Sequence, residues 1–81
     1  MRYFAWVRER IGRETETLDV PSDVKTGSDL IDWLAAQGEE YAFLEEHKLS
    51  VRVAVDQHLI DLHDDLNTPS EIAIFPPMTG G

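Results

Sequence analysis

The sequence contains no cysteine, so neither disulfide bonds nor thiolate metal ligands can stabilise it, and it offers no side-chain thiol for chemistry. Basic residues are few: 7 Lys and Arg stand against 16 Asp and Glu, which gives a formal net charge of −9. This deficit argues against nucleic acid and against anionic membrane surfaces, because both need Lys and Arg. The acidic excess either attracts a basic protein partner or only keeps the domain soluble, and both interpretations stay open.

Long hydrophobic runs are also absent. No apolar stretch approaches the roughly 20 residues that span a bilayer. The apolar start reaches Arg8 too soon to be the core of a signal peptide, so we expect a cytoplasmic protein. A length of 81 residues indicates one domain, and such a small domain buries only about 60% of its unfolded surface.

The first twenty residues predict two strands. Met1 to Val7 is dense in aromatic and β-branched residues and is apolar on both faces. Glu14 to Val20 alternates between two faces, one of which carries Glu16 and Leu18. The short turn at residues 11–13 favours a hairpin between these strands.

A helix is predicted to begin at Thr26, which forms the N-cap of a capping box with Asp29 in place of the usual Glu. Apolar residues follow at helical spacing, and Gly38 stands where a left-handed residue would end the helix. Residues 39–46 predict a short second helix. The second half of the chain predicts three more strands, at residues 50–55, 59–62 and 72–75.

This order of elements predicts an α+β fold, a mixed sheet of four to five strands with one main helix packed on one face. The helix covers only that face. We therefore expect Phe4, Trp6 and Phe75 to form an exposed apolar patch on the other face, a feature typical of partner surfaces. The alternative is that the short second helix or a loop covers them.

Side chains suited to catalysis are scarce. No nucleophile elbow and no phosphate-binding glycine loop is present. His58 and His63 lie near several aspartates, but they point to different faces, so we interpret the region as an exposed turn and expect no metal site. Asp64 and Asp65 are interpreted as loop charges.

The chain leaves its last predicted strand through Pro76-Pro77-Met78-Thr79-Gly80-Gly81. This divides it into a domain at residues 1–75 and a flexible tail at residues 76–81. The prolines favour an extended exit, and the two glycines, which lack a Cβ, would fit a narrow channel in another protein. An α-carboxylate there becomes an acyl donor only after activation, for instance by adenylation. The alternative is a disordered, inert terminus.

Three stretches carry a resemblance to a known family: Tyr3-Phe4-Ala5 leading to Arg8-Glu9 and Gly12, then Val51 to Val55, and Phe75 to Gly81. Over essentially its whole length the sequence resembles the small, sulfur-carrying subunit of molybdopterin synthase, which has the ubiquitin-like β-grasp fold. Members of this family commonly end in Phe-Pro-Pro, an aliphatic residue, Ser or Thr, and Gly-Gly.

The resemblance implies a sulfur donor that is not the catalytic subunit. In this scheme an E1-like adenylyltransferase uses ATP to form an acyl-adenylate at Gly81, and a sulfur donor system converts it to a thiocarboxylate. The tail then enters the large synthase subunit, within a heterotetramer, and sulfur passes to cyclic pyranopterin monophosphate. No permanently bound cofactor is implied.

By matching position, the resemblance places the acyl chemistry at Gly81 and Gly80, and partner contacts at Phe4, Arg8, Leu59, Phe75, Pro76, Pro77, Met78 and Thr79. The sequence departs from the family at the turn Asp56-Gln57 and in the loop at residues 67–71. Three alternatives stay open. They are a carrier for thiamine, cysteine or tRNA thiolation, a ubiquitin-like modifier joined to lysines, and a binding module with an inert tail.

Overall fold

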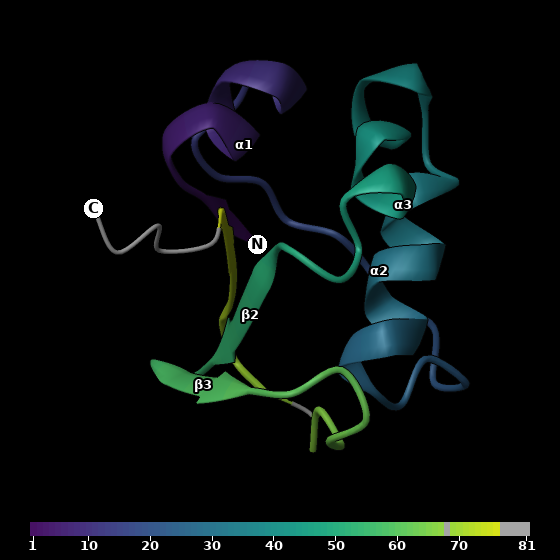
Figure 1. Ribbon diagram of the computed structural model, residues 1–81. Helices are drawn as coiled ribbons and strands as arrows, with labels where there is room; N and C mark the ends of the chain where they lie inside the picture. The colour runs from purple at the N-terminus through teal and green to yellow at the C-terminus, as the bar shows by residue number, and fades with distance from the viewer. Residues whose placement is uncertain (68, 77–81) are drawn as a thin grey trace.

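The computed structural model describes residues 1–67 and 69–76 (Figure 1). Its elements, in chain order, are β1 (Arg2–Tyr3), α1 (Ala5–Ile11), α2 (Gly27–Ala35), the 3-10 helix η1 (Glu39–Tyr41), α3 (Phe43–Glu46), β2 (Arg52–Val55), β3 (His58–Ile60) and β4 (Ile72–Phe75).

The four strands form one mixed sheet in the order β1-β4-β2-β3. β4 pairs in parallel with β1 and antiparallel with β2, and β2 pairs antiparallel with β3. β4, the last strand of the described residues, therefore lies inside the sheet, between β1 and β2. This arrangement confirms the predicted α+β architecture.

The prediction of a strand from Met1 to Val7 is wrong beyond Tyr3. Phe4 is still extended, but Ala5 adopts a left-handed φ of 51°, and α1 begins there. Val7 and Ile11 are buried one helical turn apart, and Gly12, at φ 87°, ends the helix in the left-handed conformation typical of a C-terminal glycine. The apolar character of Val7, assigned to a strand face, thus belongs to the buried side of a helix.

The second predicted strand, at residues 14–20, is reduced to a single bridge in the described part of the chain. Thr15 pairs antiparallel with Arg2, and the amide of Tyr3 donates to the carbonyl of Glu14 at 2.9 Å. The predicted alternation is nevertheless present, because Glu16, Leu18 and Val20 are half-buried while the residues between them are exposed.

The capping box of α2 is confirmed. Thr26 Oγ1 accepts from the amide of Asp29 at 3.1 Å, and a carboxylate oxygen of Asp29 accepts from the amide of Thr26 at 3.3 Å. The helix ends earlier than predicted, with Ala36 as its C-cap. Gly38 has an extended φ of 171° and precedes η1, so its predicted left-handed role is wrong. The predicted short helix is present as η1 and α3.

A two-residue turn joins β2 to β3. Val55 pairs with His58, and the intervening Asp56 and Gln57 have φ values of 47° and 71°. Two successive positive φ angles define a type I′ hairpin turn, which is usually built from Asn and Gly. Both residues are accommodated here, so the departure from the family pattern leaves the hairpin intact.

α2 and α3 pack against each other on one side of the sheet, and Figure 1 shows them one above the other to the right of β2. The core lies between them and the inward face of the sheet, where Tyr3, Val53 and Ile74 are almost completely buried against Leu30 and Leu34 of α2. None of the helices in residues 1–67 and 69–76 has the length and apolar character needed to cross a membrane.

Candidate functional site

Opposite the core, the sheet has an outward face that α2 and α3 do not cover in the described part of the chain. Along β4, Ile72 and Ile74 are buried, while Ala73 and Phe75 alternate with them and are only partly buried. Directly paired residues share a face of a sheet. The pairs Arg52–Phe75 and Ala54–Leu59 therefore extend this outward surface across β2 and β3. We call this surface the open face.

Phe4 and Phe75 meet at one end of the open face. Their rings pack edge to face with centroids 6.0 Å apart, and Phe4 remains 40% exposed. The amide of Phe4 donates to the carbonyl of Ile74 at 3.1 Å, which fixes the start of α1 beside the end of β4. The structure thus brings together two predicted contact residues at the point where the chain leaves the sheet through Pro76.

Leu59 lies on β3, two strands away from β4, and is 65% exposed. Its partner in β2 is Ala54, which pairs in turn with Ala73 of β4. Both alanines have small side chains, and Ala54 is only 8% exposed. The open face therefore carries exposed apolar side chains at two separate points.

Trp6 does not belong to this surface, and its predicted place beside Phe4 and Phe75 is wrong. It is half-buried, with its ring 5.8 Å from that of Phe43 and 5.3 Å from that of His47. The short α3 covers it, as the alternative interpretation of the sequence held. Arg8 is exposed on α1.

The tail itself lies outside the described residues. The predictions for Pro77, Met78, Thr79, Gly80 and Gly81 are therefore neither supported nor contradicted by the geometry. The structure describes only the root of the tail, at Phe75 and the half-buried Pro76.

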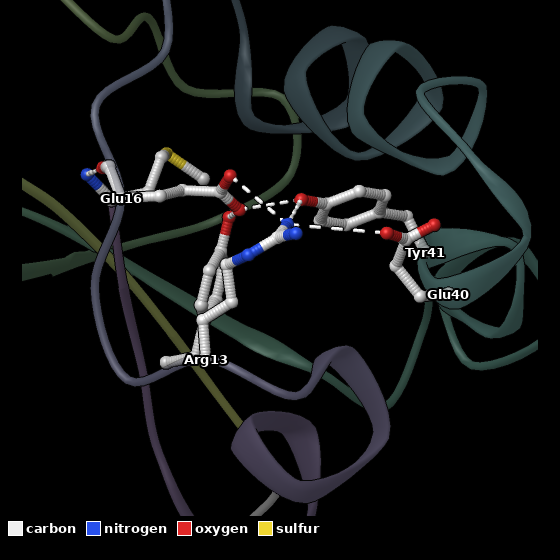
Figure 2. Close-up of polar contacts among 6 residues, drawn as sticks. Arg13, Glu16, Glu40 and Tyr41 are labelled. Atoms are coloured by element: carbon white, nitrogen blue, oxygen red, sulfur yellow. Dashed lines mark hydrogen bonds and ion pairs between the residues drawn. The ribbon is translucent and has the colours of Figure 1, made fainter.

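A polar cluster that the sequence analysis missed joins the N-terminal segment to η1 (Figure 2). The hydroxyls of Tyr3 and Tyr41 each donate to Glu16 Oε2 at 2.6 Å. Arg13 reaches both Glu16, at 3.3 Å, and the Tyr41 hydroxyl, at 2.5 Å, and lies 3.9 Å from Glu40. One signal was available, since a carboxylate at position 16 shares its face with Leu18 and Val20.

The cluster is suited to stabilising the contact between β1, residue 16 and η1, and not to proton transfer at neutral pH. Burial, followed by the hydrogen bonds to Glu16, raises the pKa of Tyr41 to about 12 and raises that of Tyr3 still further. Burial alone would raise the pKa of Glu16, but the hydrogen bonds from both tyrosines, with Arg13, lower it below its ordinary value. An acid or base for catalysis works best with a pKa near the operating pH.

Metal-ligating side chains meet at one place in the described part of the chain. Ligand atoms of Asp61, His63 and Asp64 lie within 4.8 Å of one another at the surface. One oxygen of Asp64 already accepts from the amide of Asp61 at 2.9 Å, which makes it part of the turn. His58 is not part of this group. Its ring nitrogen Nδ1 lies 3.0 Å from the carbonyl oxygen of Asp56 at the hairpin turn.

An open groove of about 600 Å³ lies between residues 18–25 on one side and residues 65–67 and 69–72 on the other. Its charged lining residues, Asp19, Lys25 and Asp65, are all exposed. These charged groups face solvent in an open groove, so the groove offers no enclosed catalytic environment.

The mixed sheet with an interior C-terminal strand, the capped helix across one face and the uncovered opposite face define a ubiquitin-like β-grasp domain. The model of the ThiS family matches residues 1–81, and the chain belongs to the ThiS family. This membership confirms the β-grasp fold that the resemblance implied.

Three relatives match nearly the whole chain, and each is called "Molybdopterin synthase sulfur carrier subunit". The Escherichia coli protein is 40% identical over 80 residues, which cover 98% of this chain and 94% of the relative. The Haemophilus influenzae protein is 38% identical, with the same coverage of both chains. The Dictyostelium discoideum protein is 36% identical, and the match covers 96% of this chain and 90% of the relative. The chain is thus similar to carrier subunits from bacteria and from a eukaryote.

Proposed function

We propose that this chain is the sulfur carrier subunit of a molybdopterin synthase and that Gly81 carries the sulfur. The observation that carries the proposal is similarity over nearly the full length to three sulfur carrier subunits, with identities of 36% to 40%. The fold supports it, because the chain runs from β4 to Pro76 beside the Phe4–Phe75 pair, in which Phe4 is exposed and Phe75 is partly buried. A carrier needs both features: a surface for docking and a chain end that projects from it.

The chemistry takes place at the carboxyl group of Gly81. An adenylating enzyme joins this carboxylate to the α-phosphate of ATP, and pyrophosphate leaves. A sulfide-level nucleophile from a sulfur donor then attacks the carbonyl carbon and expels AMP, which leaves a thiocarboxylate. Transfer of that sulfur to cyclic pyranopterin monophosphate, with the oxygen of a water molecule replacing it, restores the carboxylate.

The carrier supplies sulfur and docking contacts, and the large subunit supplies the catalytic residues. The tail from Pro76 to Gly81 spans at most about 20 Å when extended, enough to reach into a partner's active site. Phe4, Leu59 and Phe75 contact the partner, and Arg8 supplies a further contact. ATP is used only by the activating enzyme, so the carrier needs no resident cofactor, and the assembled synthase is a heterotetramer. The product needs two sulfurs, so loaded carriers must be supplied more than once.

Intact mass spectrometry tests this proposal directly. The chain is incubated with a competent E1-like adenylyltransferase, ATP and a sulfide source. The expected result is a mass gain equal to one oxygen-to-sulfur exchange, localised to Gly81 by fragmentation. Sulfur transfer to the pterin precursor in the presence of the large subunit then fixes the pathway. No mass gain with an enzyme proven active on another carrier would overturn the proposal, and lysine-linked adducts would indicate a protein modifier instead.

A further inference from the structure

Two arginines stand on the open face, one on each side of β4. Arg2 of β1 pairs with Ala73, and Arg52 of β2 pairs with Phe75. Their neighbours Tyr3 and Val53 point into the core and are almost completely buried. Because successive side chains of a strand alternate, both arginines point outward, and both are exposed.

The arginines bracket the aromatic pair where the tail leaves the sheet. The guanidinium carbon of Arg2 lies 5.5 Å from the centroid of the Phe4 ring, and that ring packs 6.0 Å from Phe75. Arg52 stands directly across from Phe75, close enough for the two side chains to be neighbours. Positive charge therefore flanks the apolar contact on two sides, in a chain whose net charge is −9.

The carboxylates of this face lie toward the other end of β4. Glu71 approaches Arg2 only loosely, at 3.8 Å, and both side chains are exposed. Asp56, at the hairpin turn, accepts from the amides of Ser70 and Glu71 at 3.0 Å each. Within residues 1–67 and 69–76, no carboxylate lies within ion-pair distance of Arg52. Its guanidinium donors are available to another molecule.

We propose that Arg2 and Arg52 extend the apolar contact of Phe4 and Phe75 into a docking surface that takes a partner protein presenting carboxylates around that contact. The identity of this partner rests on the proposed function, which makes it the large subunit of molybdopterin synthase. Arginine binds a carboxylate through two parallel hydrogen bonds, which fixes orientation as well as affinity. An apolar centre with arginine beside it is a composition enriched at interface hot spots.

The overall acidity of the chain does not conflict with a locally basic contact. Net charge acts over the whole approach of two proteins, and salt screens it beyond about 10 Å. Close pairs at the interface determine which groups must face each other and how fast the complex dissociates. A partner can therefore be basic as a whole and still place acidic side chains opposite Arg2 and Arg52.

The test is calorimetric binding of a purified molybdopterin synthase large subunit to charge variants of this chain. Arg52→Glu is the main variant, because Arg52 makes no ion pair within the described chain whose loss would affect folding. We expect Arg52→Glu to weaken binding about tenfold or more. Arg52→Gln should weaken it less, and Arg52→Lys should fall between Arg52→Gln and the wild type, because lysine keeps the charge but cannot make two parallel hydrogen bonds to one carboxylate. Arg2→Glu should weaken binding in the same direction.

Lys25→Glu is the matched control. It changes the net charge by the same amount, at an exposed position before α2 and away from the open face. We expect its affinity to stay within about twofold of the wild type. Equal effects of Lys25→Glu and Arg52→Glu, or no effect of Arg52→Glu, would overturn the docking role of the arginines and leave the proposed sulfur carrier unaffected. A wild-type chain that does not bind the large subunit would overturn both.

Discussion

Glu16 is the residue on which the contacts of the N-terminal segment converge. Its side chain receives two tyrosine hydroxyls, one from β1 and one from η1, and its backbone carbonyl accepts from the N-terminal ammonium group at 2.9 Å. Hydrogen bonds to a charged acceptor are stronger than those between neutral groups. One carboxylate thus ties the start of the chain to the segment that follows α2.

Replacing Glu16 with Gln tests this role through pH. The folded state lowers the pKa of Glu16 below its ordinary value of 4.5, so the ionised carboxylate stabilises the fold above that pH. The stabilisation is lost as the pH falls through the folded-state pKa. We expect Glu16→Gln to cost about 1 kcal/mol of unfolding free energy at neutral pH, and the difference from wild type to shrink below about pH 4.5. Denaturant unfolding across this range measures it.

Glu14→Gln is the control for that experiment. Glu14 is exposed, and its described contact is made through its backbone carbonyl, so its amide variant should follow the wild-type profile at every pH. An equal loss in both variants would mean that net charge, and not the tyrosine contacts, sets the acid stability.

Gly81→Ala tests the proposed carrier chemistry at a single residue. Position 81 lies beyond the last strand of the fold, so the variant should unfold at the same denaturant concentration as the wild type. A methyl group at the reacting residue should clash in a channel that accepts only glycine, and we expect adenylation to be abolished. Pyrophosphate release by the activating enzyme measures this step. Normal release with the alanine variant would contradict the narrow-channel argument.

At the scale of elements, the sequence predicted those whose signals are local. The capping box identified the start of α2, and alternation identified the inward residues of the segment at 14–20. α1 was missed because aromatic and β-branched residues suggested a strand. Its signals were Val7 and Ile11 at helical spacing before Gly12. What no local rule indicates is the left-handed Ala5, which turns the chain from strand to helix in one residue.

Thr26→Ala should weaken the main helix. It removes the oxygen that accepts from the Asp29 amide and leaves one end of the capping box empty. Loss of a threonine N-cap typically costs about 1 kcal/mol, so we expect the unfolding free energy to fall by roughly that amount. Thermal unfolding checks it, and Thr26→Ser, which keeps the oxygen, should recover most of the loss. A serine variant as unstable as the alanine variant would show that the methyl group, and not the cap, matters.

At the scale of the whole molecule, only some of the candidate site was predictable. Phe4 and Phe75 were expected on an uncovered face, and the structure brings them into contact. Leu59 was predicted only from the family resemblance. Local sequence did not indicate its exposure, because that exposure depends on the pairing of β3 with β2. Trp6 was wrongly grouped with them, because the prediction placed it in a strand. It lies in α1, and its side chain packs against Phe43 instead. The tyrosine–Glu16 cluster joins residues 25 positions apart, and only the folded chain shows such a contact.

Because Phe75 lies on the open face and not in the core, a change at Phe75 should affect partner binding much more than it affects folding. The side chain is partly buried against Phe4 and lies on the side of the sheet opposite the core. We expect Phe75→Asp to lower the unfolding free energy by only about 1–2 kcal/mol, since an edge-to-face aromatic pair and some buried apolar area are lost. The affinity for the large subunit should fall far more, by over about tenfold, because a charge then occupies the centre of the contact.

Leu49→Asp is the control: Leu49 is 91% exposed between α3 and β2, so its variant should bind and fold normally. Global unfolding of Phe75→Asp would instead make Phe75 a core residue, and the docking surface would lose its centre.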